Sequence, residues 1–210
     1  MKLRVMLLIV GILFTGLAGV TATGMNQQKQ AGARLSAIQL SDTEIANILY
    51  MRQEEKLAHD VYFVLYEKWG VPIFANICES EQRHMDAIKS LIEFYNLEDP
   101  IVDNSIGSFA DSEFTVLFED LTDTETESLI DAYNAGVLIE EMDIADLNEK
   151  IGQTKARNVL RVFENLLAGS ENHLAAFQSQ VDNYDTQSQQ TCVNSGTFIQ
   201  ARNRDGSCLN

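Results

Sequence analysis

An apolar stripe that contains a glutamate and a histidine constrains the fold of this chain more than any other feature. From Ile73 to Tyr95, apolar residues recur every three or four positions, the spacing that places side chains on one face of a helix. Glu81 and His84 stand on this stripe, one helical turn apart. A carboxylate and an imidazole that point into a core need a partner, because burying an unpaired polar or charged group is costly. A metal ion would satisfy both side chains.

The apolar pattern of the whole chain predicts an all-α fold, and no stretch alternates with the period of a β-strand. Ser41 with Glu44 forms a capping box that is expected to open the first helix, and Thr124 with Glu127 forms one for the third long helix. We therefore predict a four-helix bundle made of two helical hairpins joined by a long crossover. The expected helices cover residues 41–69, 72–97, 111–121, 123–151 and 154–184.

The two halves of the chain repeat one pattern. Residues 76–85 can be laid on residues 165–174, which pairs His84 with His173. Each half therefore supplies an acidic pair on one helix and a histidine on the next, as in a bundle with pseudo-twofold symmetry. The two acidic pairs are Glu54-Glu55 and Glu140-Glu141.

Carboxylates from two helices and Glu-x-x-His turns from two others form the layout of a carboxylate-bridged di-iron or di-manganese site. Carboxylates can bridge two cations and neutralise their charge, and imidazoles add affinity for first-row transition metals. The apolar stripe of the third long helix favours Glu140 as its ligand, whereas the internal repeat favours Glu141, so both are retained. The candidate ligands are Glu55, Glu81, His84, Glu140, Glu141 and His173.

Four stretches between Leu40 and Val181 resemble an uncharacterised family of ferritin-like proteins, related in fold to rubrerythrins and ferritins. These stretches are residues 51–58, 80–87, 139–147 and 165–173. The resemblance implies a ferritin-like four-helix bundle. It matches Glu81 and His84 to the second-helix pair of the di-iron pattern. It also matches Glu55, followed by Tyr62, to the first-helix ligand of rubrerythrins, and His173 to the fourth-helix histidine.

Ser170 departs from that pattern, because it stands where the fourth helix should carry a glutamate. Glu171 follows it but lies about 100° round the helix, which makes it a poor substitute. Three outcomes stay open. The site is asymmetric and completed by the additional Glu140 or Glu141 carboxylate, or it holds a single metal ion, or metal binding has been lost.

The first 22 residues have the pattern of a secretory signal peptide. Lys2 and Arg4 precede an apolar run over residues 6–17, and the small residues at 20–22 suit cleavage after Ala22. An uncleaved anchor helix is the alternative. We expect an exported protein, periplasmic, cell-surface or extracellular, without a membrane segment once the signal has been cleaved.

The mature chain is expected to have three parts: a linker over 23–40, the bundle over 41–184 and a polar tail over 185–210. Cys192 and Cys208 lie in this tail and could form a disulfide in an oxidising compartment. Cys78 would remain, and an inert buried thiol is the favoured interpretation for it.

A net charge of −16 argues against a nucleic-acid partner, since phosphates attract Lys and Arg. We predict an exported metal protein whose iron, di-iron or mononuclear, reacts with dioxygen or peroxide in a ferroxidase or peroxide-reducing activity. Manganese is compatible with the same ligands, and a homodimer is compatible with the fold. The competing hypothesis is a metal-free helical bundle that binds a protein partner or acts at the cell surface.

Overall fold

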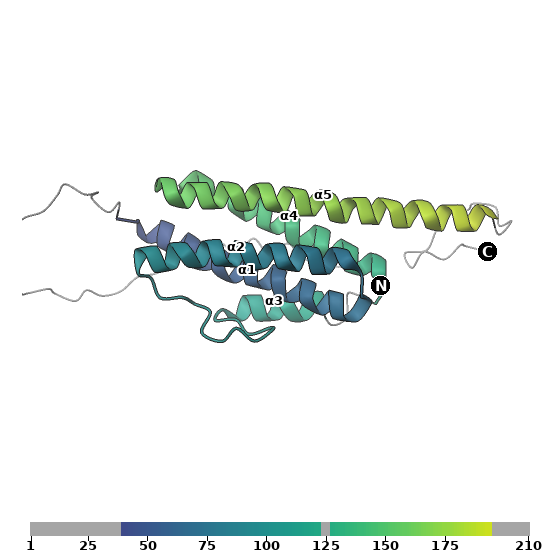
Figure 1. Cartoon of the computed structure of the whole chain (residues 1–210), viewed down its shortest axis with the longest axis horizontal. Helices are drawn as coiled ribbons and strands as arrows, with labels where there is room; N and C mark the ends of the chain where they lie inside the picture. Colours follow the sequence, from purple (N-terminus) through teal and green to yellow (C-terminus); the bar gives the residue numbers. More distant parts are fainter. Residues whose placement is uncertain (1–38, 123–126, 195–210) are drawn as a thin grey trace, which may run out of the picture. The chain divides into compact units, whose positions relative to one another are not determined.

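The structure is a computed structural model that describes residues 39–122 and 127–194, with side chains up to residue 186 of the last helix. These residues form five α-helices and, within the two ranges, no strand, so the prediction of an all-α chain is confirmed (Figure 1). The predicted signal peptide, most of the linker and the Cys192–Cys208 pairing fall on residues outside the described part. The helices are α1 (Asp42–Trp69), α2 (Pro72–Tyr95), α3 (Ser112–Thr122), α4 (Leu129–Gln153) and α5 (Arg157–Asn194).

The first helical hairpin has the ends that its sequence predicts. Ser41 Oγ accepts a hydrogen bond from the backbone N–H of Glu44 at 3.2 Å, and Glu44 Oε2 accepts one from the backbone N–H of Ser41 at 2.8 Å. At the other end of α1, Gly70 takes a left-handed conformation with φ 63° and donates its N–H to Tyr66 O. Pro72 opens α2 two residues later, so α1 and α2 form a tight hairpin.

The prediction that Thr124 and Glu127 cap the third long helix is wrong. The helix α4 begins at Leu129, and its capping box consists of Ser128 and Asp131. The backbone N–H of Ser128 donates to Asp131 Oδ2 at 3.1 Å, and the N–H of Asp131 donates to Ser128 Oγ at 3.3 Å. Ser and Asp at this spacing make the same reciprocal bonds as Thr and Glu, and they stand directly where the apolar stripe starts.

The last helix also differs from its prediction, since α5 continues to Asn194 instead of ending near Tyr184. Residues 185–194 contain neither glycine nor proline, so nothing in them stops a helix that is already formed. Figure 1 shows the last turns of α5 running past the other helices.

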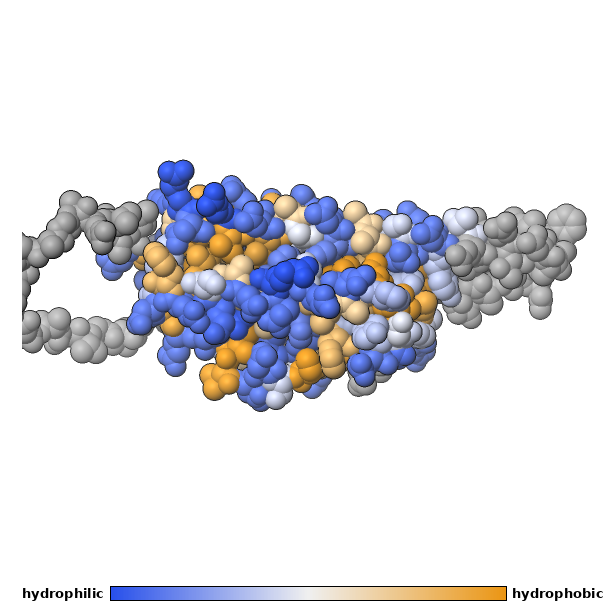
Figure 2. Space-filling view, in the orientation of Figure 1, coloured by the Kyte–Doolittle hydropathy of each residue, from blue (hydrophilic) through white to orange (hydrophobic). Residues whose placement is uncertain are grey.

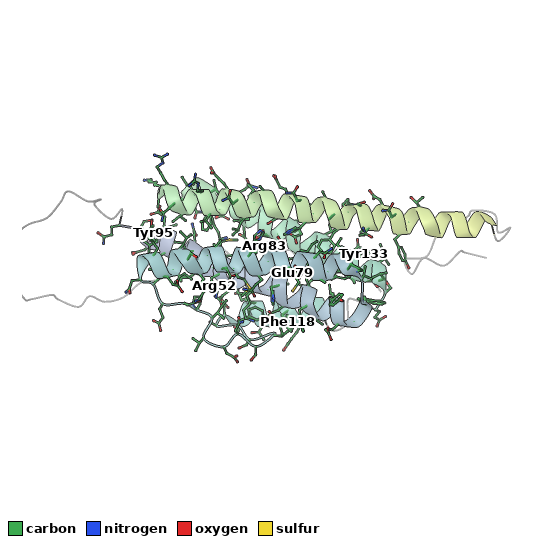
Figure 3. All side chains as sticks on the ribbon, in the orientation of Figure 1. Arg52, Glu79, Arg83, Tyr95, Phe118 and Tyr133 are labelled. Atoms are coloured by element: carbon green, nitrogen blue, oxygen red, sulfur yellow. The ribbon has the colours of Figure 1, made fainter. Side chains whose placement is uncertain are left out.

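The four long helices contact one another in a ring. The helix α1 packs on α2 and α4, and α5 packs on the same two helices from the opposite corner. The short helix α3, which lies in the predicted crossover, packs on α1 (Figure 1). Arg52 of α1 (Figure 3) attaches the crossover to the bundle. Its guanidinium forms an ion pair with Asp99 at 3.2 Å and donates a hydrogen bond to Met85 O at 3.0 Å.

Two apolar clusters fill the interior, one toward each end of the ring of helices. One contains Tyr62, Phe74 and Phe177, and the other contains Ile88 and Phe163. On each long helix, the predicted metal ligands lie between the residues of one cluster and those of the other. The candidate site is therefore a polar layer enclosed between two apolar ones.

The exterior is different in character. Figure 2 shows a face that is largely hydrophilic, with smaller hydrophobic patches. Among the described helices, none combines the length and the apolar character needed to cross a membrane.

Candidate metal centre

Five of the six predicted ligands converge in the polar layer. They form two groups in which one potential ligand atom from each residue lies within 4.8 Å of the others. Both groups contain Glu81, so a single carboxylate joins them. The first group is Glu55, Glu81 and His84, and the second is Glu81, Glu140 and His173.

Each imidazole faces the shared carboxylate. His84 Nδ1 lies 2.8 Å from Glu81 Oε2 and 3.1 Å from Glu55 Oε2. His173 Nδ1 lies 2.7 Å from Glu81 Oε1 and 3.6 Å from Glu140 Oε2. The two rings are nearly parallel, with centroids 5.5 Å apart and an interplanar angle of 27°. The internal repeat of the sequence thus corresponds to two similar half-sites around Glu81.

Gly169 of α5 allows this arrangement, and sequence reasoning did not single it out. A Cβ atom at this position would lie 2.6 Å from Nε2 of His84 and 2.7 Å from its Cε1. The bare backbone of α5 therefore lies against the far edge of the His84 ring. The ring is held with Nδ1 toward the carboxylates because Nε2 already abuts the helix.

Glu141 does not reach the site, which decides between the two candidates on α4. Its side chain is exposed, whereas Glu140 is 2% exposed and lies in the second group. The physical reason is the helical rotation of about 100° between neighbouring residues, which turns one of them outward when the other points inward. The apolar stripe, and not the internal repeat, was the better guide.

Asp143, and not Glu141, is the second carboxylate that α4 contributes to the polar layer, and the sequence analysis did not select it. It follows Glu140 by one helical turn and is 5% exposed. Its Oδ2 accepts a hydrogen bond from Ser170 Oγ, which also lies 3.0 Å from Leu166 O. The serine that departs from the expected ligand pattern therefore holds a carboxylate supplied by the neighbouring helix. The three-residue spacing from Glu140 was the signal in the sequence.

Two further buried side chains border the site. The Tyr62 hydroxyl donates to Glu140 Oε1 at 2.6 Å, and burial together with the nearby carboxylates raises the pKa of Tyr62 well above its ordinary value. Glu54 is also buried, and burial and the adjacent Asp143 raise its pKa. The phenol of Tyr62 therefore stays protonated and fixes one oxygen of Glu140.

The histidines carry the positive charge of the layer. Burial alone would lower their pKa values, but the adjacent carboxylates raise the pKa of His84 to about 11 and that of His173 to about 9. The pKa of Glu81 moves the other way: burial favours its protonated form, and the contacts with both imidazoles outweigh this and lower the pKa to about 2. Two protons on imidazoles thus compensate part of the carboxylate charge.

The other carboxylates hold protons more readily than usual. Burial, and then the nearby Asp143, raise the pKa of Glu55 well above its ordinary value. Burial raises the pKa of Glu140 to about 6 and that of Asp143 to about 7, with further contributions from neighbouring carboxylates. The four carboxylates of the layer outnumber its two histidines, so a bound cation could replace protons that these side chains hold.

The unpaired atoms of the layer test whether a metal would fit. Within the described side chains, the buried polar atoms that lack a hydrogen-bond partner are concentrated here. They include Glu55 Oε1, Glu81 Oε1, Asp143 Oδ1 and His173 Nδ1; the 2.7 Å contact between Glu81 and His173 is close but lacks hydrogen-bond geometry. Unpaired buried polar atoms are costly, and a cation would satisfy them together. Carboxylate and imidazole donors suit iron and manganese.

These features define an all-helical protein with a buried carboxylate–histidine cluster between two apolar layers. Residues 44–197 match the family described as an uncharacterized protein domain, DUF2202, and the chain belongs to this family.

A relative in Methanocaldococcus jannaschii, the uncharacterized protein MJ0754, is 46% identical over 145 residues, which cover 69% of this chain and 78% of that protein. The crystal structure described as that of the hypothetical protein MJ0754 superposes with a TM-score of 0.70 and 45% identity. The superposition covers 72% of this chain and 87% of the other.

Proposed function

We propose that this chain is a ferritin-like protein whose polar layer holds two divalent metal ions, with iron as the physiological metal and manganese as a competitor for the same ligands. The ring of four long helices, built from two hairpins with α3 in the crossover, supports the ferritin-like relation. The observation that carries the proposal is the position of Glu81. It is 2% exposed and lies between two imidazoles and among carboxylate oxygens that have no hydrogen-bond partner.

The ligands divide between two half-sites. Glu55 and His84 would hold one ion, Glu140 and His173 the other, and Glu81 would be shared. Asp143 would supply the carboxylate that a glutamate at position 170 would otherwise provide, with Ser170 orienting it.

Charge favours two ions over one. The four carboxylates Glu55, Glu81, Glu140 and Asp143 balance two divalent cations when both histidines are neutral. A single divalent ion would leave two buried negative charges to be neutralised by protons, at a cost in free energy. A dinuclear site is therefore the better match to these residues than a mononuclear one.

Iron bound in this layer would supply electrons to dioxygen or peroxide, which is the basis of ferroxidase and peroxide-reducing activities. The chain contributes the surroundings. The apolar clusters on both sides exclude bulk water, Tyr62 fixes Glu140 through its hydroxyl, and Gly169 lets the backbone of α5 hold the His84 ring. Export through the signal-peptide pattern of residues 1–22, and assembly as a homodimer, belong to the same proposal.

Metal content tests this function. The full chain, loaded with ferrous iron without oxygen and desalted, should retain about two ions per chain by elemental analysis. Glu140→Gln should lower the iron content by at least about half, because the neutral amide loses both charge and a ligand oxygen. Glu141→Gln is the matched control, since its exposed carboxylate lies one residue away and should not affect binding.

The double variant His84→Ala, His173→Ala removes the imidazole of each half-site and should abolish binding. The proposal would be refuted if the wild-type protein retained less than about 0.2 ion per chain after loading with iron or manganese. That result would favour a metal-free helical module that binds a protein partner. Equal loss of metal in Glu140→Gln and Glu141→Gln would also count against it, because it would place the ions on the surface.

A further inference from the structure

Carboxylates between α1 and α4 lead from the polar layer toward the surface. The outermost is Asp146, whose side chain is 27% exposed. Glu54 is 4% exposed, and Asp143, at 5% exposed, belongs to the layer. We call these three residues the acidic line. The binding of two ions in the layer gives no role to Asp146 or Glu54.

Hydrogen bonds between α1 and α4 fix how the two helices run past each other. The Tyr50 hydroxyl on α1 donates to Asp146 Oδ2 on α4 at 3.0 Å. Further along α1, the Tyr62 hydroxyl donates to Glu140 Oε1 at 2.6 Å. Residue numbers therefore rise along α1 where they fall along α4, so the helices are antiparallel.

This register places Glu54 and Asp143 at the same level of the bundle. Glu54 follows Tyr50 by four residues on α1, and Asp143 precedes Asp146 by three residues on α4. Each is thus about one helical turn, roughly 5 Å, nearer to the layer than the Tyr50–Asp146 bond. The electrostatics agree, because burial raises the pKa of Glu54 and the charges of Asp143 and Asp146 raise it further.

Two oxygens of the acidic line are free to contact an ion. Among the described side chains, Glu54 Oε2 and Asp143 Oδ1 are buried atoms without a hydrogen-bond partner. Such atoms are costly, and a passing cation would contact them in place of the water that it leaves behind. Neither of the two candidate metal groups in the described part of the chain includes a residue of the line. The line therefore suits the passage of ions better than their storage.

A positive group of the chain itself occupies the outer end. Lys150 Nζ lies 2.8 Å from Asp146 Oδ1 and 3.9 Å from the centroid of the Tyr50 ring. The Lys150 side chain is only 9% exposed, so its ammonium lies against the protein and not in solvent. An ion that approaches Asp146 from solvent has to compete with Lys150 for this carboxylate.

The side of the layer formed by α2 and α5 is less suited to the entry of cations. The side chains of His84 and His173 on these helices are 12% and 11% exposed. A cation that approached there would meet the two imidazoles that carry the positive charge of the layer, and like charges repel. The α1–α4 side offers carboxylates instead.

We propose that hydrated divalent cations, such as ferrous or manganous ions, reach the metal layer along the acidic line. They pass from Asp146 to Glu54 and then to Asp143. Lys150 closes the outer end when no cation is present. This inference rests on the proposed function, because the line ends at the proposed metal site. It adds that Asp146 and Glu54 control how fast ions arrive and not how many are bound.

Cobalt(II) is the probe, because its visible absorption strengthens when side chains replace its water ligands and the measurement needs no oxidant. The full chain is mixed with cobalt(II) in a stopped-flow instrument, and the absorbance gives the rate of uptake. Elemental analysis after desalting gives the number of ions bound at equilibrium. The rate tests the acidic line, whereas the number tests the site itself.

Glu54→Gln keeps the size of the side chain but cannot exchange a proton for a cation. Uptake should be about tenfold slower than in wild type, and the number of ions bound should be unchanged. Glu141→Gln is the matched control, since it alters an exposed carboxylate of α4 and should leave the rate within about twofold of wild type. If Glu54→Gln fails to fold by circular dichroism, the partly exposed Asp146→Asn should show the same slowing.

Lys150→Gln removes the competing ammonium, so uptake should be at least about twofold faster. Lys89→Gln is its control, because Lys89 is an exposed lysine of α2 and should not affect the rate. An unchanged rate in Lys150→Gln would refute the closing role of Lys150.

Equal rates in wild type, Glu54→Gln and Asp146→Asn would overturn the acidic line and leave the metal site standing, because ions would then enter elsewhere. A lower number of bound ions in Glu54→Gln would also overturn it, because Glu54 would then be a ligand. Cobalt(II) binds to such ligands more tightly than ferrous iron does. Wild-type protein that binds no cobalt(II) at equilibrium would therefore refute the proposed function, and this inference with it.

Discussion

Glu44 is predicted to supply an unusually large share of stability for a single carboxylate at the start of a helix. Its Oε2 completes the capping box of α1 with Ser41, at 2.8 Å from the backbone nitrogen. Its Oε1 accepts hydrogen bonds from the backbone N–H groups of Lys155 at 2.8 Å and Ala156 at 2.9 Å. One side chain thus joins the start of α1 to the turn that precedes α5.

The magnitude follows from the charge on this carboxylate. Burial alone would raise the pKa of Glu44, but the hydrogen bonds from the backbone N–H groups of Ser41, Lys155 and Ala156 lower it from 4.5 to about 2. A difference of one pKa unit corresponds to about 1.4 kcal/mol, so this shift sets an upper limit of about 3 kcal/mol on the contribution of ionised Glu44 to the free energy of unfolding, and solvent screening at the helix end reduces it to about 2 kcal/mol. Because the folded-state pKa is the lower one, this stability is complete above pH 4.5 and is lost as the pH falls toward 2.

Glu44→Gln keeps the size of the side chain and removes the charge. In urea unfolding followed by circular dichroism, the variant should be less stable than wild type by about 2 to 3 kcal/mol at pH 7 and by about 1 kcal/mol at pH 3. Glu93→Gln is the control, because Glu93 forms an exposed pair with Lys89 and should change stability by less than about 0.5 kcal/mol. A loss in Glu44→Gln that is the same at both pH values would refute the electrostatic reasoning.

Two further predictions concern the polar layer. Gly169→Ala places a methyl group against the His84 ring, so it should lower the iron content by at least about half and reduce the free energy of unfolding by about 1 to 3 kcal/mol. Gly152→Ala is the control, because a Cβ atom there meets nothing within 4 Å, and it should change neither quantity. Similar iron content in the two variants would contradict the role of Gly169. Ser170→Ala removes the hydroxyl that donates to Asp143 and should cost about 1 to 3 kcal/mol in urea unfolding at pH 8. Burial already raises the pKa of Asp143 to about 7, and loss of this hydrogen bond raises it further, so the cost should diminish below pH 6 as the carboxyl becomes protonated; a cost that grows on acidification would contradict this.

Local patterns in the sequence predicted most of the helices, because helix ends and apolar stripes depend on residues close together in the chain. The Ser41–Glu44 box and the start at Pro72 are confirmed. The start of α4 was misplaced because two capping boxes of equal chemistry stand four residues apart, and only the one at Ser128 adjoins the apolar stripe. Local chemistry alone could not choose between them.

The candidate site was predictable where a polar residue interrupts an apolar stripe, as at Glu81 and His84. The three-residue spacing from Glu140 was the one signal for Asp143, because the adjacent Ile144 continues the apolar stripe and the hydrogen-bond partner of Asp143, Ser170, comes from another helix. The contact of Cys78 with His59 likewise joins two helices at positions that look ordinary within each. Pairings of this kind depend on how the helices pack, and a single sequence does not specify them.

The single carboxylate between the two histidines has a thermodynamic consequence. Glu81 belongs to both half-sites, so an ion that binds to one of them draws on a charge that the other also uses. Linkage requires this effect to be reciprocal. An ion bound at the first half-site changes the affinity of the second half-site by some factor, and an ion bound at the second changes the affinity of the first by the same factor. The two ions would then bind as one coupled unit, and a titration of the protein with metal would not separate into two independent affinities. Replacing the histidine of one half-site should therefore also weaken metal binding at the other half-site, whose histidine is intact.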